Sequence, residues 1–576
     1  MRVLARLSAL FVAVTAIPGS PYQDLQPRAD EVTVALPFGT VIGKVSGVES
    51  FNGIPYAEPP VNRSRLRPPK KLRISLGVFN ATGPAAACPQ MPWSPDKSTS
   101  RNLEHDVPDI KETPLFQAGE DIKGQEDCLT VTVQRPKGTQ RDDMLPVIFY
   151  IFGGGFMFGA TAANDAEAFI RFAESQNQPF IFVGVNYRVA GFGFMGGAEI
   201  LQDGSANLGL LDQRMGLEWV ADNIAFFGGN PDRVTLLGHS AGSISVFDQM
   251  ALFGGDANYK GKPLFHGAIM SAGSVIPTES VDSPKAQAIY NTVVERVGCN
   301  DTDHETTLDC LRDRDFEDLY HAVNSVPRIL SYSSLALSYL PRPDGRVLTH
   351  SPDVLADKGK YHAVPVIIGD QEDEGTLFSF AQRDVNNSER LIDYLTKYFF
   401  HNATKEEVTG LVSTYPVESA AGSPFRTGLY NEYYQLYFKG KGFKRMAALL
   451  GDVVFTLARR LAIEAMHNHN STVPIWSYIG SFKYGTAYLG SSHGSDWNSL
   501  FKGNGRPAKS TRTYFLNFIH NQDPNIGVPQ THYWPKWTKI DKQLLWVKSL
   551  SNDNMTDDFR NESYAFIKGN TKALYF

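Results

Sequence analysis

Short apolar runs alternate with longer amphipathic stretches through much of the 576-residue chain. Residues 145–151 and 180–185 are almost continuously apolar, which is typical of strands buried on both faces. Residues 211–226 carry apolar side chains at helical spacing, and two glycines follow at 228–229. Because strands and helices alternate in this way, the pattern predicts an α/β fold built on a mostly parallel sheet.

The same patterns continue along the rest of the chain. Further strands are predicted at 31–44, with a break at 37–39, and at 128–134, 234–237, 268–270, 364–369 and 474–478, and helical segments include 444–467. The proline-rich segment 51–60 is expected to form a connection. No internal repeat and no linker marks a second unit, so residues 21–576 are expected to form one domain.

A candidate nucleophile lies directly after the predicted strand 234–237. Gly238-His239-Ser240-Ala241-Gly242 fits Gly-x-Ser-x-Gly, and the residues after it can continue as a helix, which is the strand-turn-helix context of a nucleophile elbow. Residues 490–494 also fit the pattern, but without a plain buried strand before them or a clear helix after them. The context therefore favours Ser240 over Ser492, with a simple glycine-serine turn as the alternative.

Two further turns follow predicted strands and suit the same chemistry. Gly153, Gly154 and Gly155 come directly after strand 145–151, and their N–H groups can face a ligand, although alone they could form only a flexible turn. The carboxylate-rich turn 370–375 follows another strand, where a hydrolase would place its acid. A solvated acidic loop is the alternative for that turn.

A serine nucleophile needs a histidine that accepts its proton and a carboxylate that orients the histidine. Six histidines follow the acidic turn in the sequence: His401, His467, His469, His493, His520 and His532. The first three lie beside Asn-x-Ser/Thr sites, which favours exposed positions. His493 follows the last predicted core strand in a glycine- and serine-rich turn, from which its imidazole could reach Ser240.

The charge and cysteine content indicate which partners and which cellular location are expected for the protein. The net charge is −6 and no dense Lys/Arg run occurs, so neither nucleic acid nor an anionic membrane is an expected partner. Residues 1–20 combine early arginines with a short apolar run, as in a secretory signal, and no later run is long enough to span a bilayer. Four cysteines without Cys-x-x-Cys spacing favour two disulfides over a zinc site.

Export is also indicated by Asn-x-Ser/Thr glycosylation sites, which are numerous for a cytosolic protein. They begin at Asn62, Asn80, Asn300, Asn386, Asn402, Asn470, Asn554 and Asn561. Between two of the cysteines, residues 89–127 form a long stretch with several prolines, mixed charges and scattered apolar residues. We expect this stretch to be a flap, either a mobile lid or a fixed wall of the site entrance.

Taken together, these motifs resemble those of the type-B carboxylesterase family, which includes cholinesterases and secreted fungal lipases. The resemblance covers most of the chain after the signal, through residues 53–60, 126–129, 151–156, 186–189, 212–214, 227–232, 238–242, 373–375 and 534–535. It implies an α/β-hydrolase fold and a secreted serine ester hydrolase that forms an acyl-enzyme without a metal or organic cofactor. A non-catalytic binding or adhesion relative is the competing interpretation.

The resemblance also implies roles for individual residues. Ser240 would be the nucleophile, Glu374 the acid and His493 the base, with an oxyanion hole formed by the N–H groups of Gly154, Gly155 and Ala241. It implies disulfides Cys88–Cys128 and Cys299–Cys310, and ion pairs Arg65–Glu126 and Arg188–Asp212. In the fungal lipases of this family, the loop between the first two cysteines is a lid.

The chain departs from the family at the residue before the nucleophile, which is His239 instead of the usual Glu. This changes the charge beside the site and hence the expected pH dependence. A hydrophobic acyl chain is the expected substrate, and a lipid interface is a further expected contact. The apolar residues on which this expectation depends are Phe156, Met157, Phe158, Val275, Ile276 and Leu330, any of which could instead fill the core.

Overall fold

A computed structural model describes residues 30–93, 103–113, 116, 122–301, 303–432, 442–530 and 532–576. The expected signal segment 1–20 and part of the flap, including Leu115, lie outside the described residues. The main sheet contains β1 Glu31–Leu36, β2 Gly39–Val45, β3 Glu49–Pro55, β4 Gly77–Asn80, β5 Thr130–Arg135, β6 Leu145–Ile151, β7 Ile181–Val185, β8 Gly229–His239, β11 Gly267–Ser271, β12 Val366–Gln371, β13 Ile475–Gly480, β14 Gln543–Val547 and β15 Asn552–Thr556.

These 13 strands form one sheet in the described part of the chain, in the order β1-β2-β3-β5-β7-β6-β8-β11-β12-β13-β14-β15, with β4 paired to β2. The strands from β7 to β14 run parallel, and antiparallel strands lie at both edges. Strands β6, β11, β12 and β13 are buried along almost their whole length, as expected when helices cover both faces of a parallel sheet. The predicted α/β-hydrolase architecture is confirmed.

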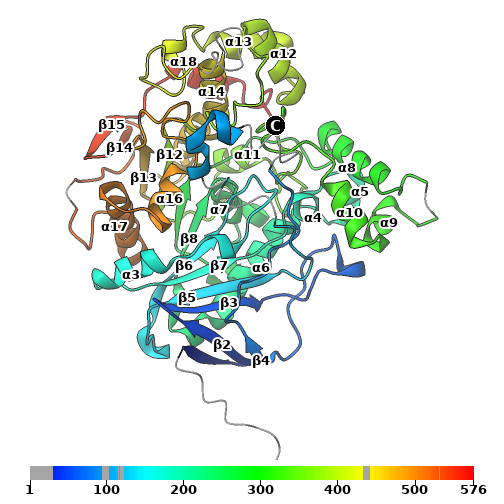
Figure 1. Cartoon of the computed structure of the whole chain (residues 1–576), viewed down its shortest axis with the longest axis vertical. Helices are drawn as coiled ribbons and strands as arrows, with labels where there is room; N and C mark the ends of the chain where they lie inside the picture. The colour runs from blue at the N-terminus through cyan, green and yellow to red at the C-terminus, as the bar shows by residue number, and fades with distance from the viewer. Residues whose placement is uncertain are drawn as a thin grey trace, which may run out of the picture.

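Helices cover the faces and ends of the sheet (Figure 1). The described helices include α3 Glu167–Ser175, α4 Ala190–Phe194, α5 Ala198–Asp203, α6 Leu208–Asn223, α7 Ala241–Ala251, α8 Pro284–Arg296, α9 Thr307–Asp313, α10 Phe316–Val323, α11 Pro352–Asp357, α12 Ser388–Tyr398, α13 Lys405–Ser413, α14 Phe443–Gly451, α15 Leu457–His469, α16 Ser495–Phe501, α17 Arg506–Asn521 and α18 Asn561–Gly569. Helices α12, α13, α14 and α18 gather at the top of the view, and α5, α8, α9 and α10 lie at its right.

The parallel strands bring several turns to one edge of the sheet. Neighbouring parallel strands end at the same edge, so the segments after β6, β8, β12 and β13 lie close together. The pairing register agrees, because Ile151 lies opposite Gly238, and Gln371 lies opposite Gly480. This edge therefore receives the glycine turn, the candidate nucleophile, the acidic turn and the segment leading to His493.

Some sequence expectations about secondary structure were wrong. Strand β3, residues 49–55, overlaps the first half of segment 51–60, which was expected to be a connection, and its ladder with β5 has an irregularity between Phe51 and Ile54. Strands β14 and β15 were not predicted. The helical segment 444–467 is interrupted by a π-helix at Asp452–Thr456.

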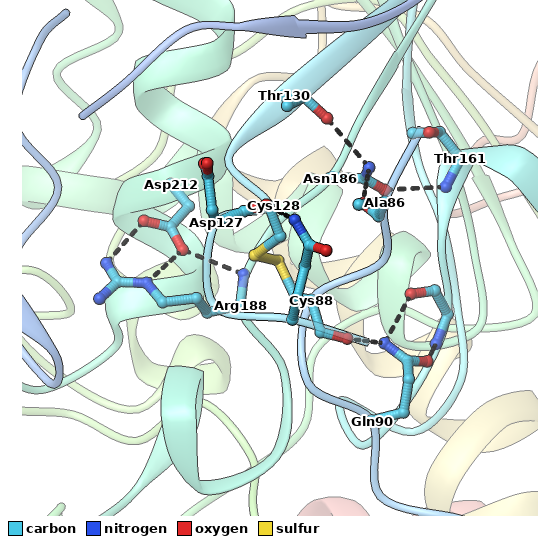
Figure 2. Close-up of a disulfide and its surroundings, with 12 residues drawn as sticks. Ala86, Cys88, Gln90, Asp127, Cys128, Thr130, Thr161, Asn186, Arg188 and Asp212 are labelled. Carbon is cyan, nitrogen blue, oxygen red and sulfur yellow. Dashed lines mark hydrogen bonds and ion pairs between the residues drawn. A yellow bond between two sulfur atoms is a disulfide. The ribbon is translucent and has the colours of Figure 1, made fainter. Parts of the chain in front are cut away.

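A buried disulfide lies at the base of the flap. Cys88 and Cys128 are paired, as are Cys299 and Cys310, in agreement with the implied pairing. Beside the first disulfide, Gln90 accepts a hydrogen bond from Gly159 N–H at 2.6 Å and donates to the Cys88 carbonyl at 2.6 Å (Figure 2). The base of the flap is thereby tied to the segment that follows the glycine turn.

Two implied ion pairs are also present. The Arg188 guanidinium donates two hydrogen bonds, of 2.8 and 2.7 Å, to the Asp212 carboxylate (Figure 2). Arg65 likewise pairs with Glu126 through both carboxylate oxygens. All four side chains are almost completely buried, so removing one partner would leave an uncompensated buried charge.

Candidate active site

Ser240 occupies a strained turn between β8 and α7. Its φ and ψ are 57° and −127°, a conformation that non-glycine residues rarely adopt. The flanking glycines allow the turn because a Cβ at Gly238 would collide with the Gly242 carbonyl, and one at Gly242 would collide with the Ile151 carbonyl. The local geometry is that of a nucleophile elbow, with the serine at the start of a helix.

His493 and Glu374 lie in line with Ser240. The His493 Nε2 atom is 2.9 Å from the Ser240 Oγ, and its Nδ1 atom is 2.5 Å from the Glu374 Oε2. Glu374 is held in turn by the Gln371 N–H, which donates to its Oε1 at 2.6 Å. The structure thus brings together the serine, the base and the acid that the sequence analysis selected, in the relative geometry of a catalytic triad.

Burial controls the protonation of this group. Burial lowers the pKa of His493 to about 4, while the carboxylates of Asp496 and Asp370 oppose that shift, so the imidazole is neutral near pH 7. Burial also raises the pKa of Glu374 well above its usual value, against the effect of the Gln371 N–H. The imidazolium that forms beside Glu374 favours the ionised carboxyl group and opposes this rise, so Glu374 can act on it as a carboxylate. A neutral histidine is the form that can accept a proton from serine.

The glycine turn lies directly against the elbow. A Cβ at Gly153 would come within 2.5 Å of the His239 carbonyl oxygen, and Gly154 and Gly155 have φ of 122° and 60°. Within the described residues, no protein acceptor is bonded to the N–H groups of Gly154, Gly155 or Ala241. These are the three donors implied for an oxyanion hole, and unbonded donors are what such a site requires.

His239 is buried beside the triad. Its ring stacks on Trp497 with a centroid distance of 5.2 Å and lies 5.1 Å from the His493 ring. Its Nε2 atom has no hydrogen-bond partner among the described residues. Burial lowers the pKa of His239 well below its usual value, and the neighbouring His493 adds to that shift. A neutral ring therefore occupies the position directly before Ser240.

A pocket opens beside Ser240, which we call the apolar pocket. Its apolar lining includes Phe152, Phe158, Ile329, Leu377, Phe378 and Phe501. Trp497, Asn498 and Lys502 of the α16 region also contribute. Of the six apolar residues expected to form the acyl site, only Phe158 lines this pocket, whereas Phe156, Met157, Val275, Ile276 and Leu330 are buried elsewhere. A hydrophobic pocket is present, but different side chains form it.

The contribution of α16 to the pocket was not expected from the sequence, and the turn before it differs from the prediction. No clear helix was expected after 490–494, yet α16 begins at Ser495. The rejected serine, Ser492, pairs its backbone with Asp373 instead of forming an elbow. Helix α16 begins two residues after His493, so its side chains lie near the site, which the sequence pattern alone did not indicate.

Asp373 also contributes to the site, although no role was expected for it from the sequence. Its carboxylate accepts hydrogen bonds from Ser491 N–H at 2.9 Å, Ser423 Oγ at 2.8 Å and Phe425 N–H at 2.8 Å. Its own N–H donates to the Ser491 carbonyl at 3.0 Å. The turn that carries Glu374 is therefore bonded directly to the turn that carries His493.

The remaining candidate sites are consistent with their expected positions on the surface. None of the eight asparagines of the glycosylation sites is buried. Exposed positions are Asn62, Asn80, Asn300, Asn402, Asn554 and Asn561, and half-buried positions are Asn386 and Asn470. The described residues contain no group of three or more His, Cys, Asp or Glu side chains placed to hold a metal ion. Nor is any helix among them long and apolar enough to cross a membrane.

Comparison with known proteins shows which protein family the chain resembles. The chain matches the model of the Carboxylesterase family over residues 30–567. It is 55% identical over 562 residues to a Gibberella zeae protein named "Secreted triacylglycerol lipase LIP1", a match that covers 97% of this chain and 93% of that one. It is 39% identical to "Lipase 5" of Diutina rugosa, with 92% of this chain and 95% of that one covered.

A solved structure shares the fold. The crystal structure of Aspergillus niger EstA superposes with a TM-score of 0.77 at 23% sequence identity. The superposition covers 95% of this chain and 99% of that one. The architecture is therefore the same over nearly the whole length of both proteins.

Proposed function

Because the chain belongs to the carboxylesterase family, its reaction is the hydrolysis of carboxylic esters, and we propose that it proceeds through an acyl-enzyme on Ser240. The observation that carries this proposal is the continuous series Ser240, His493 and Glu374, with contacts of 2.9 and 2.5 Å. The non-catalytic alternative gains no support, because the serine, base, acid and unbonded donors are all present.

The mechanism follows from these contacts. His493 Nε2 takes the Ser240 proton as Oγ attacks the ester carbonyl carbon, and the Glu374 carboxylate stabilises the imidazolium that forms. The negative carbonyl oxygen accepts hydrogen bonds from Gly154, Gly155 and Ala241. The ester bond then breaks, and the leaving alcohol takes the proton from His493. Water, activated by the same histidine, releases the acid and restores Ser240.

The acyl part of the substrate is proposed to be hydrophobic. Phenylalanine, leucine and isoleucine side chains form much of the lining of the apolar pocket next to Ser240, so an alkyl chain placed against them would be removed from water, which is favourable. The names of the fungal relatives support the same substrate class. Esters of fatty acids are therefore the proposed substrates.

Residues 89–127 are proposed to act as a mobile lid. Several apolar side chains of this segment are buried, namely Trp93, Leu103, Val107 and Ile110. Opening would expose this surface to water, at a cost that contact with a lipid surface would offset. The disulfide at its base and the Gln90 contacts would confine the motion to the distal part of the flap.

Residues 21–576 are proposed to be the exported, glycosylated hydrolase domain that remains after removal of residues 1–20. The relatives named as secreted and the eight accessible asparagines support this proposal. Mass spectrometry of the protein from a eukaryotic host would test it, through the N-terminal residue and the mass lost on deglycosylation.

The mechanism is tested by replacing each candidate serine. Ser240→Ala should lower the turnover of p-nitrophenyl octanoate by several orders of magnitude, because the variant lacks the hydroxyl group that is proposed to form the acyl-enzyme. Ser492→Ala is the matched control, since that serine belongs to the same pattern but to a different turn, and its variant should keep most of the activity. Equal turnover by Ser240→Ala and the wild type would contradict the mechanism.

A further inference from the structure

A second, more polar cavity adjoins the apolar pocket, and we call it the polar groove. It lies between the flap residues 109–113, the turn 482–495 and the segment 498–507. In Figure 1 the blue helical part of the flap lies beside α16, and Asn498 of α16 is hydrogen-bonded to the Glu112 carbonyl. His493, Asn498 and Lys502 line both cavities, so the groove and the apolar pocket meet at the catalytic histidine.

The reaction itself places the alcohol part of an ester near this histidine. The leaving alcohol oxygen must receive its proton from His493 Nε2, and a proton donor has to lie within hydrogen-bond distance of the atom it protonates. The acyl part stays on Ser240, next to the glycine turn and the apolar pocket. Because His493 lines both cavities, an alcohol part whose oxygen lies beside Nε2 can extend into the polar groove.

The groove is polar: the side chains of Lys483 and Lys502 carry donors, and its hydroxyl and carboxylate groups offer acceptors. Thr486 Oγ1 donates to the Lys483 carbonyl at 2.8 Å, and Ser495 Oγ donates to the Ser492 carbonyl at 2.7 Å. A hydroxyl that already donates keeps its oxygen lone pairs for incoming donors. The exposed carboxylate side chain of Asp109 adds further acceptors at the flap side. Free hydroxyl groups on the substrate would supply the matching donors.

We propose that the preferred substrates are esters whose alcohol part carries free hydroxyl groups, such as partial acylglycerols or acylated sugars. This inference rests on the proposed ester hydrolysis at Ser240 and specifies its substrate. A purely alkyl alcohol, or a further acyl chain, placed in the groove would cover Thr486 and Ser495 without replacing their hydrogen bonds to water. Burying polar groups without partners is unfavourable, so such esters fit the groove less well.

The test compares octanoate esters that differ only in the alcohol. Dissolved 1-propyl octanoate, 1-monooctanoylglycerol and 6-O-octanoylglucose are assayed with the wild-type enzyme by release of octanoate. Each added hydrogen bond is expected to raise kcat/KM about threefold to tenfold, so the glycerol or glucose ester should exceed the propyl ester by about tenfold. The glycerol and glucose arms distinguish the two kinds of hydroxylated alcohol.

A matched pair of variants assigns the preference to the groove. Thr486→Val should lower the ratio of kcat/KM for the hydroxylated ester to that for the propyl ester by about threefold. Thr409→Val is the control, because its hydroxyl also donates to a backbone carbonyl, at 2.7 Å, but lies on α13 and outside both cavities. Its ratio should equal that of the wild type.

The outcomes separate this inference from the proposed function. The enzyme could hydrolyse all three octanoates efficiently, with a kcat/KM for the propyl ester equal to or higher than those for the hydroxylated esters. That result would overturn the inference and leave the Ser240 mechanism intact. A wild-type preference that Thr486→Val and Thr409→Val change alike would also overturn the role of the groove. Absence of activity on every ester, including p-nitrophenyl octanoate, would instead refute the proposed function. If Thr486→Val does not fold, the wild-type comparison alone still decides the preference.

Discussion

The position of His239 allows the electrostatics of the site to be tested by one substitution. The neutral ring of His239 lies 5.1 Å from the ring of His493, the proposed base, measured between centroids. His239→Glu would place a carboxylate beside His493. Because an anion favours the protonated imidazole, the substitution should raise the pKa of His493.

The magnitude follows from the separation. Two unit charges about 5 Å apart interact by roughly 3 kcal/mol at an effective dielectric constant of about 20. This energy corresponds to roughly two pKa units. Burial also raises the pKa of the new carboxyl group, so it is only partly ionised at acidic pH. We therefore expect a net upward shift of about one to two units for His493.

The assay is the pH dependence of kcat/KM for a soluble p-nitrophenyl ester. His493 acts as a base only when it is neutral, so a higher pKa moves the loss of activity to higher pH. The wild type should keep its activity down to about pH 5, since burial lowers the pKa of His493 to about 4. The acid limb of His239→Glu should lie about one to two pH units higher. His239→Gln controls for the loss of the ring, and identical acid limbs in the two variants would refute the reasoning.

Three further predictions follow. Asp373→Asn should lower kcat about tenfold or more with little change in KM, because an amide cannot accept all the hydrogen bonds from Ser491, Ser423 and Phe425. Glu372→Gln is the control, and an equal fall of kcat/KM in both variants would contradict a positioning role for Asp373. Asp248 is buried in α7, neither of its oxygens has a partner among the described residues, and burial raises its pKa, so the contribution of Asp248 to stability falls as pH rises above its unfolded-state pKa of about 4. Asp248→Asn should thus raise Tm at pH 7 but not at pH 4, and an equal effect at both would count against this account. For the lid, activity should rise abruptly when a sparingly soluble ester passes its solubility limit, whereas smooth saturation would indicate a fixed entrance.

Much of the fold and the proposed triad could be predicted because the relevant signals are local. The apolar runs that became β6, β7, β12 and β13 are continuous, as buried parallel strands require, and the strand-turn-helix context identified Ser240. Strand β3 was missed because prolines and a glycine follow its start, and tertiary pairing with β5 overrides that local signal.

The lining of the pocket could not be predicted because it depends on packing between distant segments. Phe501 reaches the pocket only because α16 packs beside the elbow, about 260 residues away in sequence. Phe156 and Met157, although adjacent to the glycine turn, pack into the core, where Phe156 contacts Phe194. Proximity in sequence to a catalytic turn does not determine which way a side chain points.

The most direct test of the account is to identify the residue that carries the acyl-enzyme. A p-nitrophenyl alkylphosphonate should inactivate the protein with release of one p-nitrophenol per chain, and peptide mass spectrometry should find the phosphonyl group on Ser240. His493→Ala should slow the labelling strongly, because the base that activates Ser240 is absent. The account would be contradicted if inactivation were stoichiometric but the label were found on Ser492 or another residue, with Ser240 unmodified.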